Sequence, residues 1–181
     1  MKILFHACCG VCSLYPIKVM KEEGTEFALY YTNPNIHPYK EWKERKKTFV
    51  AVAEDNRVPW FVDKDYPLED FLRAQLQSEN RCECCYRVRL ENTAKKALAE
   101  GYDTISTTLF ISPYQNRELI RAVGGGIAAA YGLSFYDRDF REGFDYAQEL
   151  AKEREYYRQK YCGCIFSERD RYMKRKKKPK D

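Results

Sequence analysis

Short apolar segments alternate with amphipathic segments along most of the chain. Runs of apolar and β-branched residues between Gly, Pro or polar clusters predict strands, whereas apolar positions that recur every three or four residues predict helices. Strands are expected at residues 2–7, 26–32, 58–63, 103–109 and 133–137. Helices are expected at residues 15–23, 39–55, 68–77, 85–100, 113–131 and 145–160.

This alternation of strands and helices predicts the α/β fold class. We expect a mostly parallel sheet of about five strands with helices on both faces and right-handed crossovers, a Rossmann-like, HUP-like architecture. Ligand sites in such sheets lie outside the carboxyl ends of the strands, so the functional site is expected there. A single catalytic domain is predicted for residues 1–172, followed by a basic, disordered tail at residues 173–181.

The 181-residue chain has a formal net charge of +5, and this excess is concentrated at its carboxyl end. Residues 168–181 hold eight Lys and Arg against three Asp and Glu, so the charges of the remaining residues balance. Such a run is typical of a solvated terminus and equally of a segment that contacts a phosphate backbone. The tail alone therefore does not decide between these interpretations.

The sequence contains no recognisable secretory signal or membrane span. The start MKILFHACCG has no long apolar stretch behind Lys2, and no uncharged apolar run of about 18 residues follows it. We therefore expect a cytoplasmic protein with no membrane partner. In a reducing compartment, clustered thiols usually take part in metal or redox chemistry.

Eight cysteines fall into three groups, which are Cys8, Cys9 and Cys12, then Cys82, Cys84 and Cys85, then Cys162 and Cys164. Each group is expected on a loop at the metal site. Eight thiols exceed what one structural zinc needs, so the surplus favours a redox site, such as a cubane iron–sulfur cluster with a second metal or a dithiol pair beside it. Cys12 and Cys85 lie near predicted helix starts, where a thiolate is stabilised. Cys8 and Cys9 are expected to point apart, because neighbours on an extended backbone do so.

Two other interpretations remain open from the residues alone. Cys9-Gly10-Val11-Cys12 and Cys82-Glu83-Cys84-Cys85 match the two knuckles of a zinc site, which would indicate a zinc-stapled RNA-binding module without turnover. The first of these motifs also matches a thioredoxin-like thiol oxidoreductase, although it uses only two of the eight thiols. No Walker or Gly-x-Gly-x-x-Gly pattern follows the first strand, so a phosphate-binding nucleotide loop is not expected there.

Six motifs are spaced along residues 3–168. They are His6-Ala7-Cys8-Cys9-Gly10-Val11-Cys12, Tyr31-Thr32-Asn33-Pro34-Asn35-Ile36, Arg81-Cys82 through Cys85-Tyr86 to Arg89-Leu90, Ser112-Pro113-Tyr114-Gln115, Asp139-Phe140-Arg141, and Tyr161-Cys162-Gly163-Cys164 with Ser167. Together they resemble the cobalamin-independent epoxyqueuosine reductases, the QueH family. The resemblance implies an oxidoreductase that removes the epoxide oxygen of epoxyqueuosine in tRNA, a two-electron reductive deoxygenation that gives queuosine. Two positions depart from the family pattern, since Val11 stands where proline is common and Cys84 is an extra thiol.

The resemblance also implies cofactors and partners. The implied ligands of a [4Fe-4S] cluster are Cys8, Cys9, Cys82 and Cys85. Cys162 and Cys164 would then be a catalytic redox pair or ligands of a second, mononuclear iron. Cys12 is a further candidate metal ligand whose role stays open. The expected partners are tRNA carrying epoxyqueuosine and an external low-potential electron donor such as ferredoxin or flavodoxin.

Epoxide deoxygenation also needs two protons and a place for an unstacked base. The candidates for proton delivery, or for bonds to the metal ligands, are His6, Tyr31 and Asp139. The candidates for contacts to the substrate base are Asn33, Asn35, Tyr114 and Gln115. The expected phosphate contacts are Arg45, Arg81, Arg89, Arg141 and the basic tail.

Overall fold

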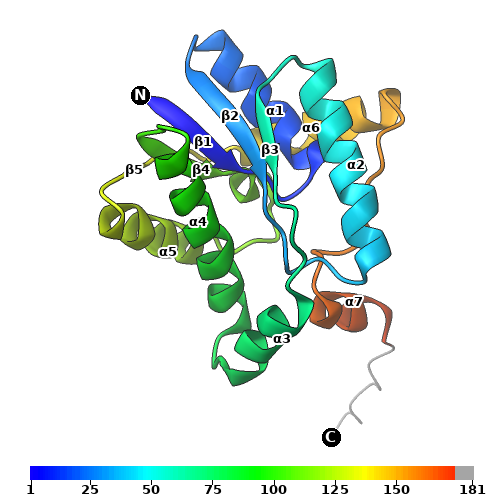
Figure 1. Cartoon of the computed structure of the whole chain (residues 1–181). Coiled ribbons are helices and arrows are strands. Elements are labelled where there is room, and N and C mark those ends of the chain that lie inside the picture. Colours follow the sequence, from blue (N-terminus) through cyan, green and yellow to red (C-terminus); the bar gives the residue numbers. More distant parts are fainter. Residues whose placement is uncertain (174–181) are drawn as a thin grey trace, which may run out of the picture.

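Five parallel strands form one sheet at the centre of the structure, a computed structural model that describes residues 1–173 (Figure 1). In chain order they are β1 (Lys2–His6), β2 (Glu26–Tyr31), β3 (Trp60–Val62), β4 (Thr104–Thr107) and β5 (Ser134–Phe135). Their order across the sheet is β3-β2-β1-β4-β5, and each neighbouring pair is parallel. The strand order therefore reverses at β1, where Phe5 pairs with Leu29 of β2 on one side and with Ser106 of β4 on the other.

Helices cover both faces of the sheet (Figure 1). One face carries α1 (Gly10–Glu22), α2 (Tyr39–Asp55) and α6 (Phe144–Glu153), with α1 packed against the other two. The other face carries α4 (Arg81–Ala99) and α5 (Arg117–Ala130), which pack on each other. Two further helices, α3 (Leu68–Gln77) and α7 (Ile165–Tyr172), lie near the carboxyl ends of the strands. Short 3-10 helices, η1 (Thr108–Ile111) and η2 (Arg141–Gly143), follow β4 and precede α6.

The central strands supply much of the hydrophobic core. Ile3, Leu4 and Phe5 of β1 have no exposed surface, and Ala28 and Leu29 of β2 are equally buried. A strand that is covered on both faces needs such a continuous apolar run, which is why its sequence does not alternate. Burial of each large apolar side chain contributes about 1.5–3 kcal/mol, so these two strands fix the framework that carries the site.

The predicted α/β class, the parallel sheet of five strands and the helices on both faces are confirmed. The predicted bounds of α2 and α3 agree with the structure. The predicted start of α1 is wrong, because this helix begins at Gly10, five residues earlier. The sulfur of Cys9 accepts the backbone N–H of Cys12 and caps the helix there, which places Pro16 inside it.

Other helix ends also differ from prediction, among them the start of α5, which begins at Arg117 and not at residue 113. α4 begins at Arg81, because the Asn80 side chain accepts the backbone N–H of Glu83 at 3.1 Å and caps the helix. The second cysteine group therefore lies in the first turns of a helix and not on a loop. α6 ends at Glu153 and not at residue 160, and Glu155 then adopts a positive φ of 55°. The residues that follow form a loop leading into α7, a helix that was not predicted.

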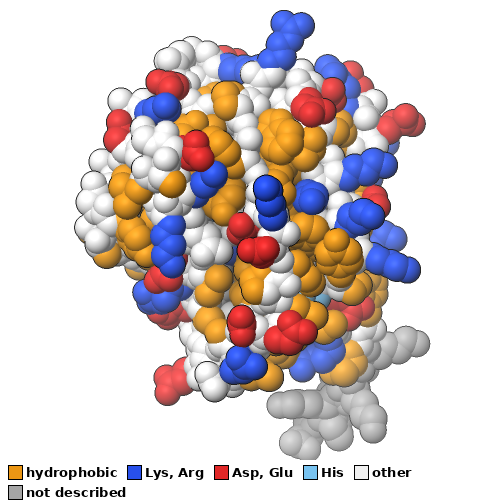
Figure 2. Space-filling view, in the orientation of Figure 1, with side chains coloured by type: hydrophobic (Ala, Val, Ile, Leu, Met, Phe, Trp, Pro, Cys, Tyr) orange, Lys and Arg blue, Asp and Glu red, His pale blue; other side chains and the backbone are white. Residues whose placement is uncertain are grey.

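Residues 174–181, which hold most of the predicted tail, lie outside the described part of the chain. The domain boundary at residue 172 stays a prediction. Within residues 1–173, no helix combines the length and the apolar character that crossing a membrane would need. Basic and acidic side chains are interspersed over the face seen in Figure 2, so that face offers no extended area of one sign.

Candidate metal and redox site

The loops that follow β1 and β4 meet at the point where the strand order reverses. The backbone N–H of Cys8 donates to the hydroxyl oxygen of Thr108 at 3.1 Å, and this hydroxyl donates to the Cys8 sulfur at 3.4 Å. In doubly wound sheets this reversal opens a crevice that commonly binds ligands. In this protein, thiols occupy the crevice.

Cys9 fixes the amino terminus of α1. Its backbone is extended, and its sulfur accepts the backbone N–H of Cys12 at 3.2 Å. The next residue must be glycine, because a Cβ on Gly10 would lie 2.7 Å from the carbonyl oxygen of Thr48 in α2. The close packing of α1 on α2 therefore determines where the thiols of this turn are held.

Cys8, Cys9 and Cys12 form a group that we term the sulfur triad, with all three Sγ atoms within 4.8 Å of one another. The prediction that Cys8 and Cys9 point apart is wrong. The chain turns into α1 at Cys9, which brings the two sulfur atoms to 4.0 Å. Sulfurs around one tetrahedral ion at about 2.3 Å stand about 3.8 Å apart, so small rotations would let the triad hold a single ion.

The negative charge of the triad is favoured on Cys9. Burial by itself raises the pKa of the Cys9 thiol, but hydrogen bonds from the other two thiols and the charge of Arg45 hold that pKa well below its usual range. The hydrogen bonds with Cys8 and Cys9 raise the pKa of Cys12 in turn. Gln159 adds a donor, since its Nε2 lies 3.1 Å from the Cys9 sulfur and 3.6 Å from the Cys12 sulfur.

The second group of thiols lies on α4. Cys82 and Cys85 are three residues apart, so they share one face of the helix, whereas Cys84 is turned about 100° away from Cys85. Cys85 is buried, and this burial raises the pKa of its thiol to about 12 against the opposing charge of Arg89. Cys84 is only half-buried.

The third group lies on residues 161–164, which we term the thiol loop. Arg45 is 2% exposed and holds this loop in place. It donates to the carbonyl oxygens of Tyr161 and Cys162, both at 2.9 Å, and pairs with Glu41 at 2.7 Å. A buried guanidinium with three such partners places Cys162 at a fixed position beside α2.

The thiol loop leads directly into α7. Gly163 has a φ of 143°, which residues with a side chain rarely adopt, and its carbonyl oxygen accepts the backbone N–H of His37 at 2.8 Å. Cys164 then caps α7, with its sulfur 3.4 Å from the backbone N–H of Ser167. Thiols therefore lie at the amino termini of α1, α4 and α7, where the helix dipole favours a negative sulfur.

We term Cys82, Cys85, Cys162 and Cys164 the sulfur tetrad. Burial raises the pKa of Cys82 and of Cys85, and the neighbouring thiols of Cys162 and Cys164 raise both further. These four thiols are thus close enough for their charges to interact. Within residues 1–173, only the triad has three sulfurs within 4.8 Å of one another, so the tetrad is spaced more widely.

Arg89 connects the triad and the tetrad electrostatically. Its side chain is 2% exposed, and the charges of Cys85, Cys162 and Cys8 are the strongest that raise its pKa. Its Nη2 is buried and has no hydrogen-bond partner within residues 1–173. An uncompensated buried charge costs about 3–5 kcal/mol, so this N–H group points to an anion between the thiols.

The donor chemistry fits an iron–sulfur cluster. Thiolates are soft ligands that suit iron–sulfur clusters and zinc. A cubane cluster takes one thiolate per iron, so its ligands stand farther apart than those around one ion, as the tetrad sulfurs do. The unpartnered Nη2 of Arg89 fits the same group, because a cluster with four thiolates is anionic.

A pocket of about 790 Å³ opens beside both thiol groups. Cys8, Cys12 and Cys162 line it, together with the predicted substrate residues Tyr114 and Gln115. The Gln115 amide lies 3.5 Å from the Cys162 sulfur and accepts the Tyr86 hydroxyl at 2.7 Å. Seven of the eight thiols and this pocket therefore meet at the carboxyl ends of the strands, where the site was expected.

Other predicted site residues lie beneath the thiols. His6 has no exposed surface, and its ring nitrogens bond to Thr107 at 2.9 Å and Asn33 at 3.2 Å. Burial and then the charge of Arg89 lower the pKa of His6 to about 3, so the ring is neutral. Asn35 is 1% exposed, and its Oδ1 has no partner within residues 1–173. These positions support a role in holding the loops, and direct contact with substrate stays a prediction.

Asp139 and Arg141 form an ion pair that does not line the pocket. The hydrogen bonds from Arg141 lower the pKa of Asp139 to about 2, so this carboxylate carries no proton at neutral pH. Their predicted roles as proton donor and phosphate contact have no support from this position and stay predictions. The prediction that Arg45 contacts phosphate has no support from its bonds to Glu41 and the thiol loop and stays a prediction.

Thr108 and Gln159 both contact thiols but are not among the predicted site residues. Thr108 directly follows a strand, so its place at a carboxyl end was a usable signal. The sequence gives no comparable signal for Gln159, because this residue lies in a stretch that was predicted to continue the helix at residues 145–160. Its contact with Cys9 spans 150 residues and depends on the whole fold.

Comparisons with known proteins identify the family. The family described as epoxyqueuosine reductase QueH matches residues 3–170. A protein of this name from Dehalococcoides mccartyi is 31% identical over 174 residues, which cover 96% of each chain. Proteins of the same name from Acinetobacter baylyi and Thermotoga maritima are each 34% identical, over 93% and 91% of this chain and 81% and 89% of their own. These matches define the protein as an oxidoreductase. The chain belongs to the QueH family of epoxyqueuosine reductases.

Among solved structures, similarity is weaker. The crystal structure of a deacetylase in complex with teicoplanin has a TM-score of 0.48 at 12% identity, and the match covers 75% of this chain and 68% of that chain. A similarity at this level carries no argument about function.

Proposed function

We propose that this protein reduces epoxyqueuosine in tRNA to queuosine by means of an iron–sulfur cluster held at the strand ends. Membership of the family supports the reductase activity. The observation that carries the cofactor is Arg89, whose buried Nη2 has no partner within residues 1–173 and whose pKa is raised by the charges of Cys85, Cys162 and Cys8. A thioredoxin-like pair, Cys9 and Cys12, would leave the other thiols and Arg89 without a function.

The spacing of the sulfurs supports one division of the ligands. The predicted cluster ligands, Cys8, Cys9, Cys82 and Cys85, would take two sulfurs from the triad and two from the tetrad. We assign the [4Fe-4S] cluster to the tetrad and a second, mononuclear iron to the triad, because the tetrad is spaced widely and the triad closely. Cys162 and Cys164 are then ligands and not a free redox pair.

The reaction consumes two electrons and two protons, breaks both carbon–oxygen bonds of the epoxide and releases its oxygen as water. When bound, the metal groups supply single electrons and a Lewis-acidic position for the epoxide oxygen. The chain positions the substrate, because Cys8 and Cys162 line one pocket and come from the two thiol groups. A molecule in this pocket therefore lies beside both groups at once.

The pocket also offers groups that suit an unstacked base. Tyr114 is 83% exposed and meets Phe144 edge to face, with 6.1 Å between ring centroids. An exposed ring of this kind supports base stacking, which is how proteins commonly hold single-stranded RNA nucleotides. The Gln115 amide beside Cys162 is placed to hold polar groups of the substrate near the sulfurs.

Electrons and RNA come from partners. Cys82 and Cys162 are exposed, so the tetrad lies near the surface and within reach of an external donor. A low-potential protein such as ferredoxin or flavodoxin fits this role. tRNA carrying epoxyqueuosine fits the pocket as the substrate, since chemistry on a loop nucleotide requires the base to leave its stack.

Anaerobic purification with iron, zinc and sulfide analysis tests this proposal, combined with mass spectrometry of tRNA nucleosides from cells that lack or express the chain. We expect iron with acid-labile sulfide, and conversion of epoxyqueuosine to queuosine only when the chain is expressed. Stoichiometric zinc and tRNA binding without conversion would instead establish the zinc-stapled module. Activity that needs Cys9 and Cys12 but tolerates Cys82→Ser and Cys162→Ser would establish the thiol oxidoreductase.

A further inference from the structure

We propose that Arg158, Lys160 and Arg171 form a basic rim that binds phosphates of a single-stranded RNA loop while one nucleotide of that loop enters the pocket. The inference rests on the proposed function and assigns the surface that holds the RNA. It names residues outside all six sequence motifs.

The three side chains surround one opening. All of them line the pocket of about 790 Å³, and all are exposed. Arg158 and Lys160 come from the loop between α6 and α7, and Arg171 comes from α7 itself. Within residues 1–173, none of the three forms an ion pair, in contrast to Arg45, which lines the same pocket but is bound to Glu41. Their charges are therefore available to a ligand.

The surroundings of the rim contain little negative charge. No Asp or Glu is among the described residues that line the pocket. Nearby carboxylates are engaged, since Glu41 pairs with Arg45 and accepts the Tyr157 hydroxyl at 2.6 Å, and Asp170 pairs with Arg169 at 2.8 Å. Glu168 is the other acidic side chain of α7. The Lys and Arg side chains at this opening therefore form a cationic cluster without neighbouring carboxylates in the lining, and such a cluster attracts anions.

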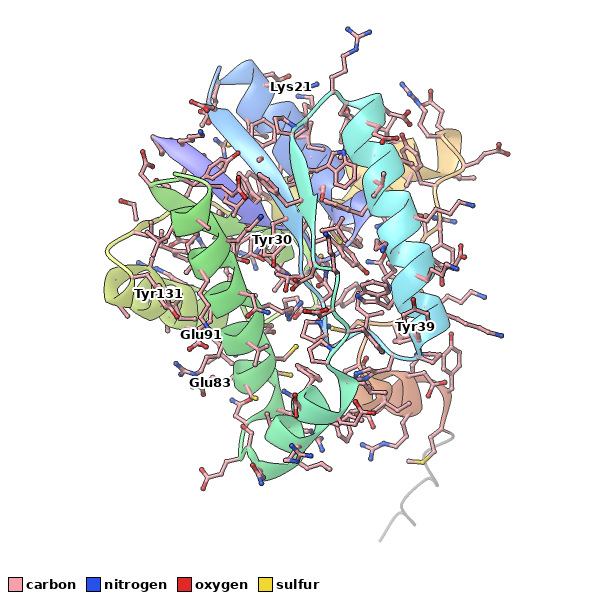
Figure 3. All side chains as sticks on the ribbon, in the orientation of Figure 1. Lys21, Tyr30, Tyr39, Glu83, Glu91 and Tyr131 are labelled. Atoms are coloured by element: carbon pink, nitrogen blue, oxygen red, sulfur yellow. The ribbon has the colours of Figure 1, made fainter. Side chains whose placement is uncertain are left out.

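Other surfaces carry acidic side chains and so differ from the rim. Glu83 and Glu91 lie on α4 (Figure 3) and are not among the residues that line the pocket. The face drawn in Figure 2 mixes both signs across its surface. A polyanion is therefore attracted to the rim in preference to these areas.

The neighbouring aromatic rings identify the anion as nucleic acid. Proteins that hold single strands combine cationic side chains along the backbone with aromatic rings on which bases stack. The rim supplies the cations, and the exposed Tyr114 with Phe144 supplies the rings in the same pocket. An inorganic phosphate or an acidic peptide would use the charges and leave the rings unused.

The test measures binding of a synthetic tRNA anticodon stem–loop to the full chain by fluorescence anisotropy at several salt concentrations. The rim variant carries Arg158→Gln, Lys160→Gln and Arg171→Gln. The matched control carries three similar changes, Lys21→Gln, Arg57→Gln and Lys95→Gln, and so has the same net charge. Lys21 lies at the end of the molecule opposite α7 (Figure 3).

Three lost phosphate contacts lower the slope of log affinity against log salt by about 2, because each contact to a single strand contributes about 0.7. Between 50 and 200 mM salt, wild-type affinity should therefore fall about 20-fold more than that of the rim variant. The control should match the wild type. Equal slopes for the rim variant and the wild type would overturn the proposal, as would equally strong competition by polyglutamate and by RNA.

A second readout separates this inference from the proposed function. Wild-type and rim-variant enzymes are compared on tRNA and on the free epoxyqueuosine nucleoside, which has no flanking phosphates. The rim variant should raise the KM for tRNA by a much larger factor than the KM for the nucleoside, because only tRNA carries the flanking phosphates. If the wild type reduces tRNA and the rim variant has the same KM for tRNA as the wild type, the rim proposal fails while the proposed function stands. If the wild type reduces neither substrate, the proposed function fails.

Discussion

Arg89 donates from its Nε to the carbonyl oxygen of Cys85 at 3.1 Å, one helical turn earlier in α4, while its Nη2 remains buried without a partner within residues 1–173. The side chain is thus anchored at one nitrogen, and the charges of Cys85, Cys162 and Cys8, which come from both sulfur groups, raise its pKa. Such an arrangement is unfavourable in a protein without an anion at this point and favourable in one that holds a metal–thiolate centre.

Replacing Arg89 should therefore affect the metal and not the fold. We expect Arg89→Met to leave the unfolding free energy of the metal-free protein within about 1–2 kcal/mol of wild type, because it removes an uncompensated buried charge together with one hydrogen bond. Iron retained after anaerobic purification should fall several-fold. Arg89→Lys keeps the charge and should retain more iron. Wild-type iron content in Arg89→Met would contradict this role.

Gln159 should contribute to metal affinity through its bonds to the triad. A hydrogen bond to a charged group contributes about 1.5–3 kcal/mol, so Gln159→Leu should weaken cobalt(II) binding by the metal-free protein about 10- to 100-fold. The thiolate-to-cobalt absorbance during an anaerobic titration measures this affinity. Gln148→Leu is the matched control, because Gln148 lines the same pocket from α6. Equal affinities for the two variants would show that the Gln159 contact is incidental.

His37 should make the docking of α7 sensitive to acid. Its Nε2 bonds to the carbonyl oxygen of Pro34 at 3.1 Å, and its Nδ1 accepts the backbone N–H of Ile165 at 3.2 Å. Burial lowers the pKa of His37 below its ordinary value of 6.5. Just below pH 6.5, His37 is therefore protonated in the unfolded chain and neutral in the folded chain. The free energy of unfolding then falls as the pH drops below 6.5, by at most about 1.4 kcal/mol per pH unit.

The readout for His37 is hydrogen exchange of residues 161–172 between pH 7 and pH 5, corrected for intrinsic rates. Protection should decrease in the wild type. In His37→Gln, whose side chain can accept and donate without titrating, protection should change less. An identical pH dependence in both proteins would remove His37 as the cause.

Gly10 should tolerate no side chain, although alanine is the better helix former. A Cβ there would lie 2.7 Å from the Thr48 carbonyl oxygen, which is backbone and cannot move aside. Gly10→Ala should lower the unfolding free energy by about 1–3 kcal/mol. Gly126→Ala in α5, where a Cβ meets open space, should raise it by about 0.5–1 kcal/mol. Denaturant unfolding of both variants decides whether packing of α1 on α2 is as tight as described.

The sheet and the long helices could be predicted because their signals are local. The apolar run of β1 and the helical period of α2 are both visible in the sequence, and the bounds of α2 agree with the structure. The start of α1 was harder to predict, because its cap is a cysteine sulfur and cysteine is not a usual capping residue. α7 has no buried residues, so it carries no apolar stripe to indicate a helix.

The candidate site could be predicted only in part. The carboxyl ends of β1 and β4 were identified, and the thiols do gather there. The division of the sulfurs into triad and tetrad could not be predicted from the sequence, because it depends on contacts between segments that are far apart in the chain. Arg45, for example, holds Cys162 through a hydrogen bond that joins residues 117 positions apart, and it pairs with Glu41.

Iron and acid-labile sulfide per chain, measured in anaerobically purified wild type, Cys85→Ser and Cys84→Ser, test the account most directly. Cys84 shares a helical turn with Cys85 but faces away from it, so it serves as the matched control. We expect about four sulfides per chain in the wild type and in Cys84→Ser, and a loss of most of them in Cys85→Ser. Protein that holds zinc without sulfide, or equal losses in the two variants, would contradict a cluster built on these converging thiols.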